Sequence, residues 1–348
     1  MNLVNVREGN TELLVPEHKE GPGPKSARVE VFYNPAMEFN RDVSISFLNS
    51  LDKEPKVLDA MAATGARGVR IANEVDAEEV VLLDVSESAV DLIKNNIRLN
   101  DVSAEVVNSS LEVHIPKHRY RYDYIDIDPF GSPVHHYPTA VKFVSRGGIV
   151  AVSATDTAVL CGTYPKKCIR RYSSKPKNNW CRHENGLRIL IAYCVREAAR
   201  YHRAATPVLS YYDGHHFRTY LKVDEGAKKA DVCLDQLENY EFEKYYWKPG
   251  DKVGPLWSGE LFDRKTLGKL EPVGKLDEDT LDIWKSESGM PVFFYDGNIL
   301  GKYFERAPIP IKDILENLRD DGYRVSRTHF SPTGFKTNAP KDELRGLF

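Results

Sequence analysis

Between residues 56 and 155, short apolar segments alternate with helical patterns, and this alternation limits the possible folds more than any other feature of the chain. Apolar strands are predicted at residues 56–61, 78–86, 104–108, 122–128 and 147–155, and a helix over 86–100, with Ser86 or Ser88 as its cap. Strands that alternate with helices are typical of a sheet covered by helices on both faces. The sequence therefore predicts a doubly wound, Rossmann-like α/β sheet.

The segments on either side of this region extend the prediction. Residues 10–15 are predicted to form a short strand, and helices are predicted over 38–51 and 185–203. Residues 207–224 form two strand-like runs joined through Asp213 and Gly214, which indicates an antiparallel hairpin at the edge of the sheet. From about residue 225 the charge density rises and Gly and Pro interrupt the pattern. We predict a catalytic domain with an N-terminal extension over 1–224 and a smaller α+β domain over 225–348.

Composition excludes several classes of protein. No apolar run approaches the roughly 20 residues that cross a bilayer, and the N-terminus shows no secretory signal. The five cysteines include no CxxC pair, which fits a reducing compartment, so we expect a cytoplasmic protein. No membrane association and no obligate protein partner are indicated. A net charge of −3 excludes a uniformly basic nucleic-acid-binding protein, although a local basic patch is present.

The first motif follows the strand at 56–61. It runs from Asp59 to Gly68 with the sequence DAMAATGARG, whose small residues let the backbone approach a ligand closely. It is not the GxGxxG dinucleotide fingerprint. The next strand ends at Asp84, where a carboxylate is placed to hold two ribose hydroxyls. Together these features predict an adenosine-type cofactor without a pyrophosphate, namely S-adenosylmethionine, although a tight turn with a solvated Asp84 is the alternative.

The second motif lies at the end of the strand over 122–128. Asp128 is followed by Pro129 and Phe130, an arrangement that methylation of an amino group requires. The lone pair of an exocyclic base amine is delocalised into the ring, so acceptors for its two N–H groups make the nitrogen more nucleophilic. Asp128 would supply a carboxylate, Pro129 a backbone carbonyl and Phe130 a ring that stacks on the extruded base. The alternative is a strand that ends in an N-capping Asp.

Six segments, taken together, resemble the tRNA (guanine-26,N2)-dimethyltransferase family of archaeal type. They are MEFNRDVS (37–44), ATGARGVR (63–70), DIDPFGSP (126–133), VSATDTAVLCGTYP (152–165), GPLWSGEL (254–261) and RTHFSPTGFKT (327–337). The resemblance implies a class I S-adenosylmethionine-dependent methyltransferase fold with a family-specific, tRNA-binding C-terminal domain. It also implies one or two methyl transfers to the exocyclic N2 amine of guanosine 26, at the junction of the D and anticodon stems.

The resemblance also implies roles for particular residues. Arg41 and Arg70 fall where the family contacts the cofactor, and a guanidinium there can hold the methionyl carboxylate. Asp84 matches the position of the family's ribose-binding acid, and Asp128 matches the position of its catalytic acid. Arg67 is a second candidate for a cofactor contact, with a surface charge at the start of a helix as the alternative.

The chain departs from the family pattern at two places. Where the family usually has an Asp-Ala pair near the adenine, this chain has Asn108-Ser109-Ser110, so a hydroxyl or backbone contact from Ser109 or Ser110 would replace the carboxylate. Some members also carry paired CxxC motifs for zinc before GPLW, whereas the stretch at 240–247 has no cysteine. We therefore expect no metal. Cys161, Cys168, Cys181 and His183 are a second possible set of zinc ligands, but the spacing of these residues matches no common zinc motif.

A basic segment follows the strand at 147–155. No acidic residue occurs from Thr157 to His183, and aromatic residues are interleaved with the cations Lys166, Lys167, Arg170, Arg171, Lys175, Lys177 and Arg182. Such a segment is typical of a surface that binds phosphates, and a solvated loop is the alternative. The C-terminal segment 324–336 is also basic and contributes Arg327 and Lys336. His329 in the same segment is either a phosphate contact or a structural histidine. The predicted partner is tRNA.

Other functions stay open on the sequence. An amino-directed methyltransferase that acts on another RNA or on a DNA base is the main alternative. DNA adenine enzymes more often carry Pro-Pro-Tyr/Phe than the Pro-Phe-Gly found here. A catalytically silent RNA-binding module is disfavoured because Asp128 and Phe130 are present. An NAD-dependent dehydrogenase is disfavoured by the absence of GxGxxG.

Overall fold

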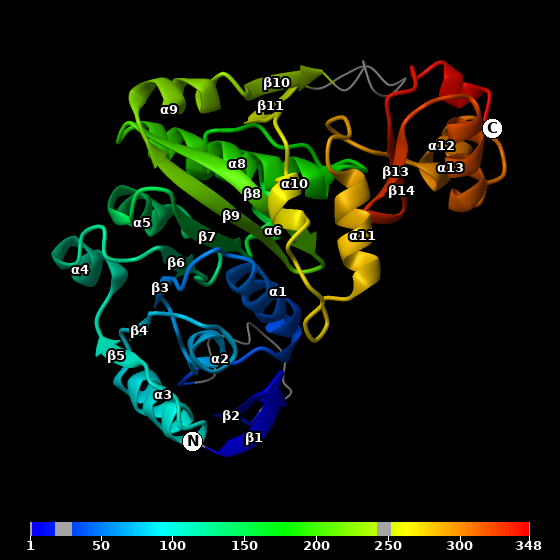
Figure 1. Ribbon diagram of the computed structural model, residues 1–348. Coiled ribbons are helices and arrows are strands. Elements are labelled where there is room, and N and C mark those ends of the chain that lie inside the picture. Colours follow the sequence, from blue (N-terminus) through cyan, green and yellow to red (C-terminus); the bar gives the residue numbers. More distant parts are fainter. Residues whose placement is uncertain (1, 18–29, 242–251, 348) are drawn as a thin grey trace.

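The centre of the molecule is a seven-stranded sheet with the strand order β5-β4-β3-β6-β7-β9-β8 (Figure 1). The computed structural model describes residues 2–17, 30–241 and 252–347. Five neighbouring strands are parallel: β3 (Lys56–Asp59), β4 (Glu79–Asp84), β5 (Glu105–Asn108), β6 (Tyr124–Ile127) and β7 (Gly148–Ala154). The edge is completed by the antiparallel pair β8 (Arg203–Asp213) and β9 (His216–Glu225). The predicted doubly wound sheet with a terminal hairpin is confirmed.

Helices cover both faces of this sheet. On β9, the hydroxyl of Tyr220 lies 2.9 Å from Ser44 Oγ of α1 (Glu38–Asn49). Three residues earlier, Phe217 packs against Gly186 of α8 (Arg182–Ala199), where a Cβ would lie only 2.7 Å from the ring. Side chains three residues apart on a strand point to opposite faces, so α1 and α8 lie on opposite sides of the sheet. The other helices of this region are α2 (Ala66–Glu74), α3 (Glu87–Leu99), α4 (Leu111–His114), α5 (Tyr137–Phe143), α6 (Thr157–Leu160) and α7 (Pro165–Tyr172).

The elements expected from the sequence lie close to their predicted positions. Helix α1 matches the helix predicted over 38–51, and α3 matches the helix predicted over 86–100. Ser86 is the N-terminal cap of α3, because its side chain accepts a hydrogen bond from the backbone N–H of Ala89. Helix α8 begins three residues earlier than predicted and ends four residues earlier, because β8 begins at Arg203. The predicted N-terminal strand is β2 (Thr11–Pro16), which pairs with the unpredicted β1 (Leu3–Glu8).

The main hydrophobic core continues past the predicted domain boundary. Helices α9 (Ala227–Leu234), α10 (Arg264–Leu267) and α11 (Glu278–Glu287) and strand β11 (Lys252–Trp257) contribute buried side chains to it, among them Leu256 and Trp284. Strand β10 (Leu237–Glu241) packs against this core with partly buried side chains. The end of β9 coincides with the predicted boundary at 225. The division into 1–224 and 225–348 stays a prediction. Residues 242–247 of the stretch considered for zinc lie outside the described part of the chain.

The C-terminal residues form a second, smaller core, on the right of Figure 1. A three-stranded sheet with the order β12-β14-β13 supports two helices. Leu300, Ile314 and Phe335 are fully buried between them. These elements are β12 (Tyr295–Asp296), α12 (Gly297–Tyr303), α13 (Ile311–Asp320), β13 (Val325–Thr328) and β14 (Ser331–Thr337). In the described part of the chain, no helix is both long enough and apolar enough to span a membrane.

Candidate active site

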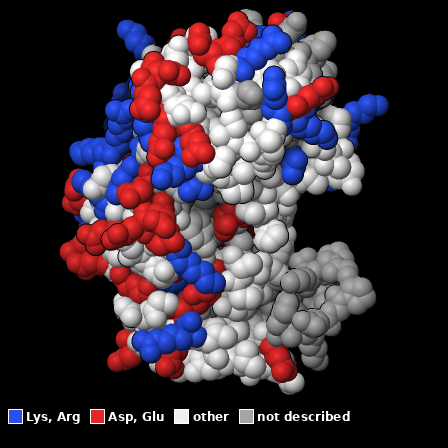
Figure 2. All heavy atoms as spheres, turned by 90° about the vertical axis from the view of Figure 1, so that its right-hand side faces the viewer, with Lys and Arg blue, Asp and Glu red and all other residues white. Residues whose placement is uncertain are grey.

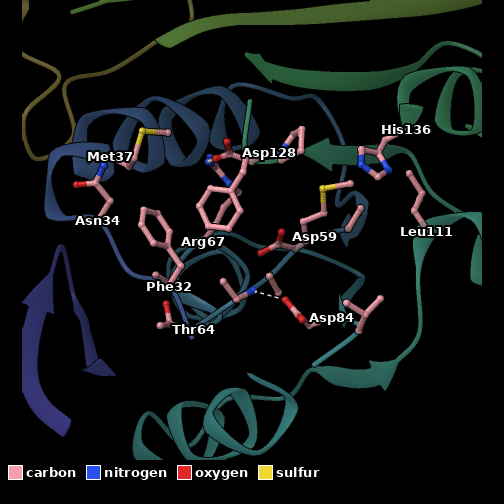
Figure 3. A pocket seen from close by; sticks show the side chains of 18 of the residues that line it. Phe32, Asn34, Met37, Asp59, Thr64, Arg67, Asp84, Leu111, Asp128 and His136 are labelled. Carbon is pink, nitrogen blue, oxygen red and sulfur yellow. Dashed lines mark hydrogen bonds and ion pairs between the residues drawn. The ribbon is translucent and has the colours of Figure 1, made fainter. Parts of the chain in front are cut away.

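A pocket of about 690 Å³ opens where the parallel strands end (Figure 3). The strand register places the carboxyl ends of neighbouring strands side by side. Asp59 of β3 lies opposite Asp126 of β6, and Asp84 of β4 lies opposite Asn108 of β5. Figure 3 shows Phe32 and Asn34 on one side of the pocket and Leu111 and His136 on the other. Ligands of open α/β sheets bind at this edge, so the pocket is the first candidate for a cofactor site.

The backbone between β3 and α2 turns tightly to form one wall of the pocket. Ala63 has a φ of +51° and Gly65 a φ of +78°, so two residues of this turn adopt left-handed conformations. Gly68 leaves no room for a side chain, because a Cβ would lie 2.4 Å from Leu82. Its backbone N–H donates to Asp59 Oδ2 at 3.0 Å. The small side chains predicted from the sequence thus bring the start of α2 close to the sheet.

Asp84 fixes this turn from the neighbouring strand. Its Oδ2 accepts from the backbone N–H of Ala63 at 2.8 Å, and its Oδ1 accepts from that of Ser86 at 2.9 Å. The side chains of Asp84 and Asp59 also appear beside the turn in Figure 3. Ser109 and Ser110 follow the next strand and line the same pocket. A carboxylate has room for about four hydrogen bonds, so Asp84 retains acceptor capacity for ligand hydroxyls.

Asp128 lies on the pocket wall in an ion pair with Arg67. Nη2 of Arg67 donates to Asp128 Oδ2 at 2.6 Å, and Nη1 donates to Ser44 Oγ at 2.6 Å. The side chain of Arg67 is 6% exposed and that of Asp128 is 20% exposed. The guanidinium therefore holds one carboxylate oxygen from the protein side. This contact, and not a solvated position at the start of a helix, is the environment of Arg67.

The other acid of this segment, Asp126, belongs to the core. It is fully buried and receives two hydrogen bonds from Arg218, with Arg67 Nε 3.4 Å from its Oδ1. Burial would raise the pKa of Asp126, but the charges of Arg218 and Arg67 outweigh burial and hold that pKa below its usual value. Burial and the charge of Asp126 raise the pKa of Asp59 to about 7. The base of the pocket is thus a cluster of buried acids and arginines.

The two arginines assigned to the methionyl carboxylate have different surroundings. Arg41 lines the pocket, but its Nε donates to Glu8 Oε2 at 2.6 Å and its Nη2 to the Asn34 carbonyl at 3.2 Å. Arg70 is fully buried, donates to Asp42 at 2.7 Å, and is not among the described residues that line the pocket. We therefore retain Arg41 as a candidate cofactor contact and assign Arg70 to the structure of the domain.

Two aromatic rings stand at the mouth of the pocket. Phe130 is 63% exposed, and its ring meets that of Phe32 edge to face with centroids 4.7 Å apart. Phe130 is predicted from the sequence but Phe32 is not, because the segment before α1 has no periodicity or recognisable motif. Several other lining residues were also missed, namely Tyr33, Asn34, Met37, Val85, Leu111, Glu112, His136, Thr155 and His215.

Most of the basic segment is on the surface. Lys166, Lys167, Arg170, Lys175 and Arg182 are exposed, and Arg171 and Lys177 are partly exposed. Figure 2 shows one face of the molecule, where Lys and Arg side chains are interspersed with Asp and Glu side chains on both sides of the upper half, and an area without charged side chains lies between the two sides. Charged side chains of both signs therefore flank an uncharged area on this face.

The C-terminal basic segment divides into exposed and buried side chains. Arg327 is exposed, whereas Lys336 is only 1% exposed and donates to Glu184 Oε1 at 2.6 Å. His329 lies 2.7 Å from Glu287 Oε2 and accepts from the backbone N–H of Tyr212. These contacts correct the expectation that Lys336 faces RNA phosphates, because its side chain is engaged inside the protein. Of the two roles left open for His329, they favour that of a structural histidine over that of a phosphate contact.

The donor set fits the predicted cofactor. Asp84 offers a carboxylate to ribose hydroxyls, and the small side chains of Ala60, Ala62 and Ala63 leave space for a nucleoside beside the sheet. Val85, which is 70% exposed, adds apolar surface next to Asp84. Within residues 2–17, 30–241 and 252–347, no group of three or more His, Cys, Asp or Glu side chains is placed to hold a metal ion.

Comparison with known proteins gives consistent matches over nearly the whole chain. The family model described as N2,N2-dimethylguanosine tRNA methyltransferase matches residues 9–347. The chain is 38% identical to the tRNA (guanine(26)-N(2))-dimethyltransferase of Pyrococcus furiosus and 39% identical to that of Thermococcus kodakarensis, and each match covers 98% of this chain and 97% of the relative. The structure of Trm1 from Pyrococcus horikoshii in complex with S-adenosyl-L-methionine matches with a TM-score of 0.89 and 34% identity over 99% of both chains.

Proposed function

The chain belongs to the N2,N2-dimethylguanosine tRNA methyltransferase family, and we propose that it transfers methyl groups from S-adenosylmethionine to the exocyclic N2 amine of guanosine 26 in tRNA. The observation that carries this proposal is the composition of one pocket. Asp128, Pro129 and Phe130 line the same 690 Å³ space as Asp84 and the turn after β3. A group that can activate an amine and a group that can hold a nucleoside cofactor therefore share one cavity.

The cofactor would be held by the residues at the ends of β3, β4 and β5. Asp84 would bind the ribose hydroxyls, Ser109 and Ser110 would lie near the adenine, and Arg41 would lie near the methionyl carboxylate. S-adenosylmethionine supplies an electrophilic methyl group on a sulfonium. Asp59 at the base of the pocket adds a carboxyl group, which favours a positively charged ligand when it is ionised.

The amine would be activated by the residues at the end of β6. Arg67 binds Oδ2 of Asp128, so Oδ1 is the oxygen that accepts an N–H of the base. The Pro129 carbonyl accepts the second N–H, which concentrates the nitrogen lone pair on the side facing the methyl donor. Phe130, exposed at the mouth of the pocket, stacks on the guanine after it leaves the helical stack.

The tRNA backbone would bind the exposed basic segment. Helix α7 ends at Tyr172, whose hydroxyl lies 2.7 Å from Ser132 Oγ, and Ser132 follows Phe130 by two residues. The cations of α7 and of 175–182 therefore lie on a segment that contacts the loop carrying the catalytic residues. Lysines and arginines that neutralise phosphates contribute affinity without reading sequence, which leaves the choice of base to the pocket.

Mass spectrometry of nucleosides tests this function directly. The protein is incubated with methyl-labelled S-adenosylmethionine and a tRNA transcript that has guanosine at position 26, and a matched transcript with adenosine there is the control. We expect N2-methylguanosine, N2,N2-dimethylguanosine or both from the first transcript only. Label on an adenine or cytosine amine, or equal label on both transcripts, would instead favour an amino-directed methyltransferase with another target.

A further inference from the structure

A short chain of hydrogen bonds connects the basic helix α7 to the loop that carries Phe130. Tyr172, the last residue of α7, is fully buried, and its hydroxyl lies 2.7 Å from Ser132 Oγ and 2.7 Å from Asp156 Oδ1. The other oxygen of Asp156 accepts from Arg171 Nη1 at 2.9 Å. One hydroxyl thus joins the end of α7, the segment before α6 and the loop after Phe130.

The direction of these hydrogen bonds follows from the groups present. Burial raises the pKa of Tyr172, so the phenol keeps its proton. A carboxylate only accepts, and therefore the single proton of Tyr172 is donated to Asp156. In the second contact, the Tyr172 oxygen therefore acts as the acceptor, and the hydroxyl of Ser132 donates to it. Loss of the hydroxyl would deprive both Ser132 and Asp156 of this partner.

Phe130 itself has little packing to hold it in place. Its ring is 63% exposed and meets Phe32 only edge to face. The residue after it is better fixed, since the N–H of Gly131 donates to Thr155 Oγ1 at 2.7 Å and the carbonyl of Gly131 accepts from the N–H of Thr155 at 2.8 Å. The position of the ring therefore depends on anchors in the residues that follow it, and Ser132 is the anchor that reaches α7.

Building on the proposed function, we propose that Tyr172 is a positioning residue for methyl transfer. Its hydroxyl holds Ser132 and thereby keeps the Phe130 ring and the Pro129 carbonyl where the extruded guanine needs them. A displacement of about 1 Å in such groups can slow a reaction by a factor of about 100, although the displaced group takes no part in the chemistry. The same helix then binds the tRNA backbone and fixes the loop that receives the base.

The variant Tyr172→Phe removes this hydroxyl and leaves the ring in the core. The matched control is Tyr137→Phe, since Tyr137 is also fully buried but its hydroxyl has no hydrogen-bond partner in the described parts of the chain. We expect kcat of Tyr172→Phe to fall roughly tenfold or more. Its KM for tRNA and its Kd for S-adenosylhomocysteine should stay within about twofold of wild type. Tyr137→Phe should match wild type in all three quantities.

A second variant breaks the same bond from the partly exposed side. Ser132→Ala should lower kcat to the same extent, and the double variant should be no slower than either single one, because both substitutions remove the same hydrogen bond between Tyr172 and Ser132. Thermal unfolding of each variant sets an assay temperature at which all are folded. A kcat of wild-type size in Tyr172→Phe, losses that multiply in the double variant, or a change confined to KM would overturn the proposal.

This experiment separates the inference from the proposed function. If wild-type protein leaves guanosine 26 unmethylated, the proposed function is wrong. If wild-type protein methylates guanosine 26 and Tyr172→Phe does so equally fast, only the positioning role is wrong.

Discussion

Replacement of Asp128 tests the central step of the proposed reaction. The variant Asp128→Ala removes the carboxylate that would accept an N–H of the guanine amine. It also removes the acceptor that lies 2.6 Å from Arg67 Nη2, but the guanidinium keeps Ser44 Oγ at 2.6 Å and Asp126 Oδ1 at 3.4 Å. The lost charge-assisted bond should cost about 1–3 kcal/mol of folding free energy.

The loss of stability and the loss of rate can be separated by their size. Natural domains have about 5–15 kcal/mol of stability, so a loss of about 3 kcal/mol leaves more than roughly nine molecules in ten folded. Removal of a positioned acceptor lowers the rate by about 100- to 10,000-fold, which partial unfolding cannot produce. We therefore expect Asp128→Ala to fold, to bind S-adenosylhomocysteine with nearly wild-type affinity, and to lose most of its kcat.

The assay for Asp128 is a single-turnover measurement with saturating tRNA and cofactor, together with calorimetric titration of S-adenosylhomocysteine. Asp91→Ala, on an exposed position of α3, is the matched control and should be indistinguishable from wild type. Asp128→Asn keeps one carbonyl oxygen and should retain more activity than Asp128→Ala. A single-turnover rate of Asp128→Ala within about threefold of wild type would refute the role assigned to this carboxylate.

Three further predictions concern cofactor, RNA and stability. Asp84→Ala should weaken binding of S-adenosylhomocysteine by about 10- to 100-fold, since the ribose loses charge-assisted hydrogen bonds worth roughly 1.5–3 kcal/mol, and an unchanged calorimetric Kd would contradict this role. Removal of the exposed charges of Lys166, Lys167 and Arg170 should raise the Kd for tRNA and lower the slope of log K against log salt by about 0.7–0.9 per lost phosphate contact, whereas an unchanged slope would place the RNA elsewhere. Burial opposes ionisation of Glu287, but attraction to His329 and Lys336 outweighs burial and lowers its pKa to about 2. Relative to its ordinary value of 4.5, this stabilises the fold by on the order of 3 kcal/mol above pH 4.5, and the stabilisation is lost as the pH falls towards 2. Urea unfolding of Glu287→Gln should therefore show a weaker dependence on pH over this range than wild type, and an equal dependence would contradict the assignment.

The parts of the fold that could be predicted are those encoded by local patterns. Strand ends, the helix cap, for which Ser86 and Ser88 were the two candidates, and the hairpin through Asp213 and Gly214 are set by residues within a few positions of one another. The structure has the cap at Ser86, the hairpin as predicted, and the ends of the parallel strands at or shortly before the predicted residues. The small-residue turn and Asp84 could be found for the same reason, because each follows an apolar strand. Parallel strands then bring these ends to one edge of the sheet.

The contacts that could not be predicted join residues far apart in the chain. Arg67 and Asp128 are separated by 61 positions, and Lys336 and Glu184 by 152. A lysine in a basic segment indicates a surface charge unless its buried partner is known, and that partner is visible only in the structure. Phe32 was missed for a related reason, since an isolated aromatic residue in an irregular segment has no pattern that points to a pocket.

The acid–arginine cluster beneath the pocket shows why the two acids of the Asp-Ile-Asp segment have different roles. Asp126 has no solvent exposure and receives two hydrogen bonds from Arg218, whereas Asp128 remains 20% exposed and lies beyond the last residue of β6. Breaking a buried ion pair by removing one partner leaves an uncompensated charge, which costs about 3–5 kcal/mol. Asp126 is therefore required to keep Arg218 and Arg67 in the core, and it has no surface to offer a substrate. Arg67 contacts both acids, so the core pair fixes the guanidinium and the guanidinium fixes the carboxylate that faces the pocket.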